Sequence, residues 1–311
     1  MRKRGGAGRP WQGKLKTALF IIAAAWSLIS ALESGPAQSP QPSATPGASF
    51  CIESGVLEVY FLDVGQGDSI FLRSPNGKTM LVDASESQYF GRIDDFLSAQ
   101  GVKKLDVVVA THPHNDHIGG MYKVIKSYDV GAFYTTDAAN ETSSYDNMLQ
   151  ALDERSVSAG FVYAGEKSEI AWDEDVRVRV LSPFEGEQCE LNDYSIVLNV
   201  SFGETSALLA ADAEALAEDI MLSRLPEEYL DCTVLKLGHH GSSTSTSGAF
   251  LKAASPELAI MTLGAENDYG YPHEETLARL KKRGVPYYRT DESGTILVRL
   301  NGEAYEVITE K

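Results

Sequence analysis

Apolar residues come in short runs along the chain, and the spacing within these runs predicts its strands. The run at 56–62 predicts a first strand. Residues 105–112 are apolar almost throughout, which is typical of a strand that is covered on both faces. Residues 176–181 alternate between apolar and polar positions, so this segment is expected to be a strand with one face in water.

Other stretches have the spacing of helices. A helix is expected over 90–100, with Gly101 ending it. An amphipathic pattern over 143–157 predicts a second helix, with Ser143 or Ser144 as its N-cap.

Turn residues predict how neighbouring strands are joined. Asn76-Gly77 is the signature of a type I′ hairpin turn, and further hairpins are expected across Gly203-Glu204 and Asn301-Gly302. Strands outnumber helices, and the two alternate along the chain. This order predicts an α/β body of two mixed sheets with outer helices.

The N-terminus has a different composition from the rest of the chain. Residues 1–32 begin with a basic region and end in an apolar run, which is the pattern of a secretory signal peptide or an N-terminal membrane anchor. A buried core helix is the alternative. Residues 33–49 are rich in proline and serine and read as a disordered linker, so the folded domain is expected over 50–311. We therefore expect a protein that is secreted or tethered to the outer face of the cytoplasmic membrane.

The net charge limits which partners the protein can bind, and the cysteine content limits which disulfides it can form. The formal net charge is −17, and because residues 1–32 carry six basic residues and no acid, the remainder carries −23. A body this acidic repels phosphate backbones at long range, so nucleic-acid binding would need a local positive site. The three cysteines, Cys51, Cys189 and Cys232, are compatible with one disulfide and one free thiol after export, and the pairing stays open.

Ligand-type side chains follow three of the predicted buried strands. They are the cluster 112–117, Asp212, and the pair His239-His240. A His-x-His segment places two imidazoles on one side, and Asp116-His117 then folds back on the turn. One short loop can thus serve two adjacent cations, zinc or manganese, bridged by a carboxylate such as Asp212. Water between two cations becomes a nucleophile near neutral pH.

These motifs resemble the metallo-β-lactamase superfamily of binuclear hydrolases. The stretches that carry the resemblance are "HPHNDH", "LVDAS" and "LLAADAE". Five more, "FLDVGQGDS", "NDYSIVL", "VLKLGHHGS", "YGYPHEETL" and "YRTDESG", are similar to the extracellular hydrolase domain of ComEC-type competence DNA-uptake proteins. The resemblance covers roughly residues 55–300. It implies a four-layer αββα sandwich, two divalent metal ions and phosphodiester hydrolysis.

The resemblance also assigns roles to individual residues. His112 and His114 would hold the first metal ion, Asp116 and His117 the second, with Asp212 between them. His239 or His240 would complete the second site, and we favour His240 as the ligand and His239 as a donor to a substrate oxyanion. The residues expected to take part in catalysis are Asp116, His239 and His273.

The family pattern has a further histidine before the bridging aspartate, and this chain has none between His117 and His239. The first metal site is therefore expected to be the weaker one, with Asn192 or Ser195 facing the gap. A second departure is Tyr271, which stands where the family's Tyr-Gly-His-Pro-His motif has its first histidine. His273, the second histidine of that motif, would protonate a leaving group or bind phosphate.

Three aspartates and a basic segment are expected at the border of the site. Asp83 is expected to orient a ligand histidine rather than to bind metal. Asp63 and Asp68 lie in a glycine-rich turn that would line the site, although turn chemistry alone explains aspartates there. The basic residues at 281–283 would provide a local positive rim, or simply a solvated helix end.

The function expected from the sequence is an exported metal-dependent hydrolase acting on phosphodiesters, as a nuclease or phosphodiesterase, with DNA among the candidate substrates. A lactone or other carbonyl hydrolase of the same fold is the first alternative. A non-catalytic domain that binds DNA or the cell envelope is the second. Contact with the membrane is expected only through the N-terminal segment, and the sequence indicates no protein partner.

Overall fold

The computed structural model describes residues 55–165, 168–187 and 190–311. The expected anchor and linker, 1–32 and 33–49, lie outside the described residues, as do Cys51 and Cys189. Cys232 is described as a buried free thiol. Among the described residues, no helix is both long and apolar enough to cross a bilayer.

One mixed sheet holds eight strands in the order β15-β14-β1-β2-β3-β4-β5-β6. The strands are β1 (Leu57–Phe61), β2 (Ile70–Arg73), β3 (Thr79–Val82), β4 (Lys104–Val109), β5 (Asp129–Thr135), β6 (Ala159–Phe161), β14 (Ile296–Leu300) and β15 (Tyr305–Thr309). Strands β3 to β6 run parallel, and the pairs from β15 to β3 are antiparallel.

The other mixed sheet holds seven strands in the order β13-β12-β11-β10-β9-β8-β7. The strands are β7 (Glu169–Ile170), β8 (Arg177–Ser182), β9 (Val197–Phe202), β10 (Thr205–Leu209), β11 (Val234–Lys236), β12 (Leu258–Met261) and β13 (Tyr287–Arg289). Strands β10 to β13 are parallel, which makes the carboxyl ends of β10, β11 and β12 neighbours at one edge.

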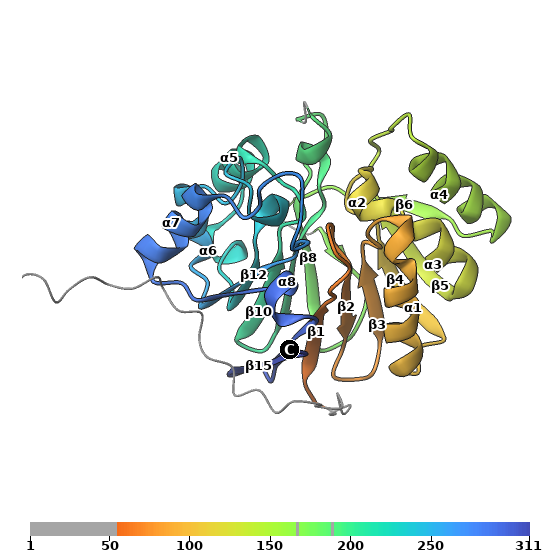
Figure 1. Cartoon of the computed structure of the whole chain (residues 1–311), viewed down its shortest axis with the longest axis horizontal. Helices are drawn as coiled ribbons and strands as arrows, with labels where there is room; N and C mark the ends of the chain where they lie inside the picture. Colours follow the sequence, from red (N-terminus) through yellow and green to blue (C-terminus); the bar gives the residue numbers. More distant parts are fainter. Residues whose placement is uncertain (1–54, 166–167, 188–189) are drawn as a thin grey trace, which may run out of the picture. The chain divides into compact units, whose positions relative to one another are not determined.

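Helices cover the outer face of each sheet (Figure 1). The α-helices are α1 (Phe90–Ala99), α2 (Asn115–Ile118), α3 (Met121–Ser127), α4 (Ser143–Glu154), α5 (Ala215–Arg224), α6 (Gly248–Ala254), α7 (Glu274–Arg283) and α8 (Thr290–Ser293). The 3-10 turns are η1 (Ser87–Tyr89), η2 (Leu191–Tyr194), η3 (Glu227–Tyr229) and η4 (Gly238–Gly241). Figure 1 shows α1 to α4 beside one sheet and α5 to α7 beside the other.

Three hydrophobic cores separate the four layers. The first joins the inner faces of the two sheets, the second lies between the eight-stranded sheet and α1, α3 and α4, and the third lies between the seven-stranded sheet and α5 to α7. In β4, Val107 and Val109 enter the first core and Val108 enters the second, as alternation along a strand requires. The predictions of a four-layer αββα sandwich and of a strand covered on both faces are thus confirmed.

Two local predictions were wrong. The β2–β3 hairpin exists, but its turn is not type I′, because a type I′ turn needs positive φ at both central residues and only Gly77 has it, at +80°. Pro75, with φ locked at about −65°, is instead the first central residue of a turn that Gly77 N closes by donating to the Ser74 carbonyl at 2.9 Å. Helix α4 is capped by Thr142, whose Oγ1 accepts a hydrogen bond from Tyr145 N, rather than by either predicted serine.

Candidate metal centre

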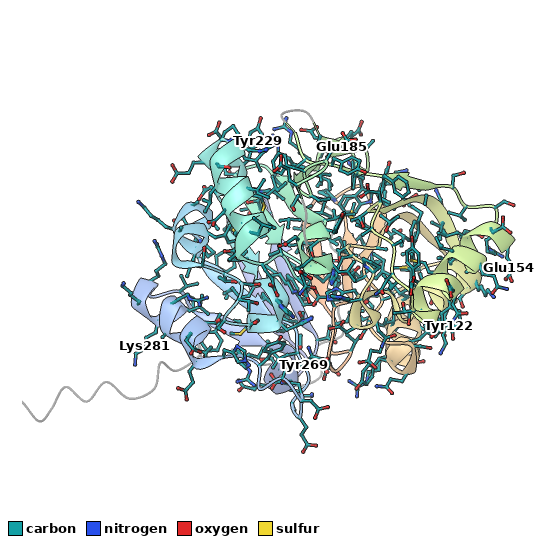
Figure 2. The ribbon with its side chains drawn as sticks, turned by 90° about the horizontal axis from the view of Figure 1, so that it is seen from above. Tyr122, Glu154, Glu185, Tyr229, Tyr269 and Lys281 are labelled. Atoms are coloured by element: carbon teal, nitrogen blue, oxygen red, sulfur yellow. The ribbon has the colours of Figure 1, made fainter. Side chains whose placement is uncertain are left out.

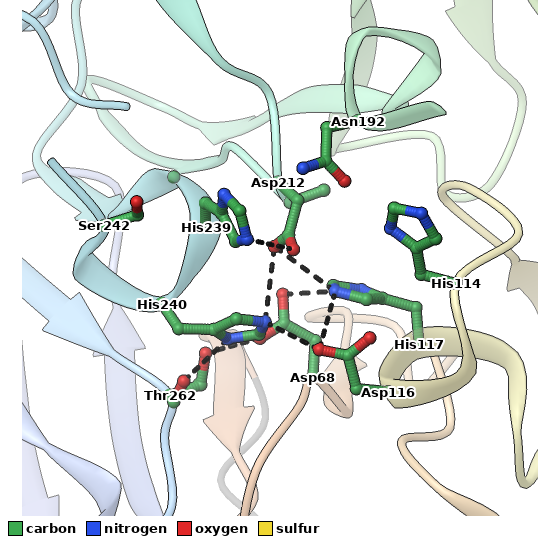
Figure 3. Close-up of polar contacts among 12 residues, drawn as sticks. Asp68, His114, Asp116, His117, Asn192, Asp212, His239, His240, Ser242 and Thr262 are labelled. Atoms are coloured by element: carbon green, nitrogen blue, oxygen red, sulfur yellow. Dashed lines mark hydrogen bonds and ion pairs between the residues drawn. The ribbon is translucent and has the colours of Figure 1, made fainter. Parts of the chain in front are cut away.

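The side chains predicted to bind metal lie where strands of both sheets end (Figure 3). The segment after β4 carries residues 112–117, the loop after β10 carries Asp212, and η4, directly after β11, carries His239 and His240. Positions far apart in the sequence therefore meet at one place. These residues can come together only if the two sheets pack face to face at a fixed spacing.

Four of these residues form a group in which the ligand atoms all lie within 4.8 Å of one another: Asp116, His117, Asp212 and His240. Asp212 Oδ1 lies 3.2 Å from His117 Nε2 and 3.4 Å from His240 Nε2. Asp116 Oδ2 lies 3.3 Å from His240 Nε2. Asp116 is the one member of the group that is not fully buried.

The donor set fits a divalent cation. His117 Nε2, His240 Nε2 and Asp212 Oδ1 are buried and have no hydrogen-bond partner, although buried polar atoms are normally paired. Three such atoms pointing at one another leave room for one shared partner, and two imidazoles with two carboxylates are a ligand set of zinc and manganese. The chain therefore has a His/Asp metal-binding cluster.

Each ligand imidazole is held by its other nitrogen. His117 Nδ1 donates to Asp83 Oδ2 at 2.7 Å, and His240 Nδ1 donates to the Thr262 carbonyl at 2.8 Å. These bonds leave Nε2 of each ring as the ligand atom. Asp83 thus lies where a histidine-orienting carboxylate is needed.

The charges around the group favour a bound cation. Burial lowers the pKa of His117, but the carboxylates of Asp212 and Asp83 outweigh burial and hold that pKa well above its usual range. The pKa of His240 is raised in the same way, with Asp212 and Asp68 outweighing burial. Two buried imidazoles among carboxylates need positive charge, and a metal ion meets this need in place of protons.

The first two histidines form a separate pair. His112 Nε2 lies 3.0 Å from His114 Nδ1, and neither joins a group of three or more ligand atoms within 4.8 Å in the described part of the chain. Burial lowers the pKa of both rings, which keeps them neutral, as metal ligation requires. Ser195 Oγ lies 3.4 Å from His112 Nδ1, and Asn192 lies beside His114 (Figure 3).

His239 lies at the edge of the group rather than inside it. Its Nε2 is 3.6 Å from Asp212 Oδ2 and 3.1 Å from Tyr271 Oη, and its Nδ1 is 3.0 Å from Glu214 Oε1. Both His239 and His240 have positive φ, at +47° and +53°, which is rare for residues other than glycine. This backbone turns the His240 ring inward to the group and leaves His239 facing Asp212 from the side.

Three expected site features do not join the group. Both ring nitrogens of His273 are engaged by the surrounding loops, Nδ1 accepting from Ser243 N at 2.9 Å and Nε2 lying 3.2 Å from the Tyr269 carbonyl. Asp63 is paired with Arg92 and Lys311. The basic segment 281–283 lies in the last turn of α7, where Figure 2 shows Lys281 directed outward.

Three residues without a predicted role support the group. Lys236 is fully buried, and its Nζ lies 2.6 Å from Asp68 Oδ2. Burial raises the pKa of Asp68, but the charges of Lys236 and His240 outweigh burial and hold it below its usual range. Glu214 and Thr262 hold His239 and His240. Of these three residues, only Lys236 stands out in the sequence, because it is a lysine inside the apolar run "VLKLG".

Comparison with known proteins agrees with this site. Residues 62–264 match the model of the metallo-β-lactamase superfamily, and the chain belongs to that superfamily. Among curated proteins it is 32% identical over 259 residues to ComE operon protein 3 of Bacillus subtilis, covering 78% of this chain and 33% of that protein. It is 31% identical over 234 residues to competence protein ComA of Neisseria gonorrhoeae, covering 75% and 31%. The chain therefore spans about a third of the length of these relatives.

Solved structures show the same fold at low sequence identity. The metallo-β-lactamase fold protein YhfI of Bacillus subtilis aligns with a TM-score of 0.50 and 12% identity, covering 78% of this chain and 99% of YhfI. CmlA, a diiron β-hydroxylase of Streptomyces venezuelae, aligns with a TM-score of 0.52 and 16% identity, covering 80% and 55%. These likenesses concern the fold alone.

Proposed function

We propose that this protein is a metal-dependent hydrolase of phosphodiesters, with single-stranded DNA or a related nucleotide polymer as its substrate class. The observation that carries the metal-dependent part is the convergence of His117 Nε2, His240 Nε2 and Asp212 Oδ1, which are buried and have no hydrogen-bond partner. The phosphodiester part is supported by the relatives, whose names concern competence and, for recombination protein 2 of Haemophilus influenzae, recombination.

Some residues of the site would bind the metal ion, and others hold those ligands in position. When bound, a divalent cation polarises a phosphoryl oxygen and lowers the pKa of water. Asp83 and Thr262 fix the two ligand imidazoles so that Nε2 of each faces the centre. Asp116 is the partly exposed member of the group, so substrate is expected to approach from its side.

His239 is placed to serve the substrate rather than the metal ion. Glu214 accepts from Nδ1, so Nε2 is directed toward Asp212 and Tyr271 at the margin of the group. In its imidazolium form, which carries a proton on both nitrogens, the ring keeps its bond to Glu214 and can donate from Nε2 to a phosphoryl oxygen that develops charge in the transition state. Replacing His239 with glutamine should therefore lower kcat more than it weakens metal binding.

The test is a substrate panel on the full chain loaded with zinc or manganese. We expect cleavage of single-stranded DNA and of a small phosphodiester, loss of that activity in EDTA, and loss in Asp212→Asn. Asp129→Asn serves as the matched control, because this carboxylate is exposed and its one ion pair among the described residues is with Arg155 on the surface. Full cleavage in EDTA would contradict a metal-dependent reaction. Cleavage of a lactone or β-lactam instead of the phosphodiesters would favour the carbonyl hydrolase. Tight, salt-sensitive DNA binding without turnover would favour the non-catalytic alternative.

We also propose that the folded body works outside the cytoplasmic membrane, secreted or tethered by residues 1–32. The basic start and apolar run of that segment support this location. The experiment is protease treatment of intact cells and spheroplasts, followed by detection of the C-terminal residues. Digestion only after cell lysis would contradict the proposal.

A further inference from the structure

A buried ion pair lies next to the four-ligand group. Lys236, the last residue of β11, places Nζ 2.6 Å from Asp68 Oδ2, and both side chains are almost completely buried. The ammonium also donates to the Ala211 carbonyl at 2.9 Å and lies 3.9 Å from Asp212 Oδ1. Lys236 thus contacts the loop that carries one metal ligand and stands close to that ligand itself.

This ion pair connects the two sheets. Asp68 belongs to the loop between β1 and β2 of the eight-stranded sheet, whereas Lys236 belongs to the seven-stranded sheet. The ligands are divided in the same way, since Asp116 and His117 follow β4 and the other two follow β10 and β11. The group is therefore complete only while the two halves keep their spacing.

Asp68 is attached to both halves at once. Its backbone N donates to the Asp116 carbonyl at 3.1 Å, which fixes it to the first half. Its carboxylate pairs with Lys236, accepts from Thr262 Oγ1 and lies 3.4 Å from His240 Nδ1, which fixes it to the second half. Figure 3 shows Asp68 below Asp212, between His240 and Asp116 in this view, and Thr262 below His240.

We propose that Lys236 and Asp68 act as a positioning pair that sets the spacing of the two halves of the metal centre before the metal ion binds. A buried ion pair is a poor source of net stability, because desolvation of the two charges offsets their attraction. Its geometry, however, is well suited to holding the β1–β2 loop and the loop after β10 at a fixed distance from each other. The pair should therefore matter more for metal affinity than for the stability of the fold. This inference rests on the metal centre of the proposed function and is independent of the substrate.

The test measures metal binding rather than turnover. Dissociation constants for zinc and manganese are measured on the full chain by competition with a fluorescent chelator, with metal stoichiometry by mass spectrometry and thermal unfolding in EDTA. Lys236→Met and Asp68→Asn are each expected to weaken metal binding by about 10–100-fold, as loss of groups that orient ligands typically does. Thr262→Val, which keeps the carbonyl that holds His240, should weaken binding less.

The double variant Lys236→Met/Asp68→Asn separates positioning from simple loss of charge pairing. It removes both charges, so the metal-free fold should recover much of the stability that Lys236→Met loses. Metal binding should stay at least about 10-fold weaker than in the unmodified protein. Recovery of affinity together with stability would overturn the proposal.

A matched control breaks a similar ion pair away from the site. Arg73→Met removes a buried partner of Glu58 in the same eight-stranded sheet, where the Nη1–Oε2 distance is 3.5 Å. It should lower the unfolding temperature and leave metal affinity unchanged. If Lys236→Met does not fold, Asp68→Asn and Thr262→Val still decide, and unchanged affinity in both would refute the positioning role. Absence of any metal binding by the unmodified chain would refute the metal centre itself, whereas metal binding without phosphodiester cleavage would refute only the proposed substrate.

Discussion

Replacing Asp83 with asparagine should damage the metal centre without changing any ligand. Asp83 is fully buried, and its carboxylate accepts three hydrogen bonds. Thr111 N donates to Oδ1 at 2.8 Å, while Thr111 Oγ1 and His117 Nδ1 both donate to Oδ2 at 2.7 Å. All of these partners are donors, and a carboxylate satisfies them because it is an acceptor at both oxygens.

An asparagine at position 83 cannot satisfy this arrangement in either orientation. If its oxygen faces His117, its NH₂ group meets Thr111 N, and two buried donors oppose each other. If its oxygen faces Thr111 N, its NH₂ group meets His117 Nδ1, and the ring must move its proton to Nε2, the ligand atom. Either conflict costs about 1–3 kcal/mol. The corresponding loss of metal affinity is about 10–100-fold.

The assay compares Asp83→Asn with Asp106→Asn, measuring the zinc dissociation constant and the unfolding temperature of each. Asp106 is a matched control, because its Oδ2 accepts from Thr79 N at 3.0 Å in the same sheet but it touches no histidine. Both variants should lose stability, and only Asp83→Asn should lose metal affinity. Unchanged affinity in a folded Asp83→Asn protein would refute the claim that Asp83 fixes the His117 ring.

Three further predictions concern metal removal, pH and the buried thiol. Stripping the metal ion with EDTA should lower the unfolding temperature by about 5–10 °C relative to protein held at 100 times the dissociation constant, which corresponds to about 2.7 kcal/mol, and calorimetry showing no shift would contradict a bound metal. Burial raises the pKa of Glu218 above its usual 4.5, so the stability that its protonated form contributes is complete below that value and lost as pH rises through the folded-state pKa. In urea unfolding with EDTA present, the stability of Glu218→Gln relative to the unmodified protein should therefore be higher at pH 7 than at pH 4, and an equal difference at both would count against this reasoning. Burial also raises the pKa of the Cys232 thiol, so in a Cys51→Ser/Cys189→Ser chain this thiol should react with Ellman's reagent only after unfolding, and rapid reaction of that folded chain would show that it is accessible.

Most of the fold could be predicted because its layers follow from local patterns. The apolar run at β4 and the amphipathic α1 each indicate which faces are covered, and those faces are the ones that the cores use. Short elements were missed where the pattern is too brief to carry a period. Strand β7 has two residues, and β6 and β13 have three each.

The members of the four-ligand group could be picked out from the sequence because histidines and aspartates at the ends of buried strands are unusual and distinct; His112 and His114 were picked out by the same signal and do not join that group. The order within His239-His240 could not be decided, because it depends on the backbone. Both residues have positive φ. The direction of each ring therefore differs from the one that it would have in an extended chain. The adjacent glycines, Gly238 and Gly241, hint at a tight turn but do not specify which imidazole enters the group.

Lys236 could not be assigned because its role depends on a contact made across 168 positions of sequence. The strand that contains "VLKLG" was predicted to be buried, but a lysine within it is expected to face solvent, since lysine is almost never fully buried unless it is paired. Its partner, Asp68, lies in a glycine-rich turn where aspartate needs no special explanation. Each residue has an ordinary local interpretation, and only the packing of the two sheets brings them within 2.6 Å. The same packing brings Asp116 and His240 together, so the part of the site hardest to read from sequence is the part on which the spacing of the predicted ligands depends.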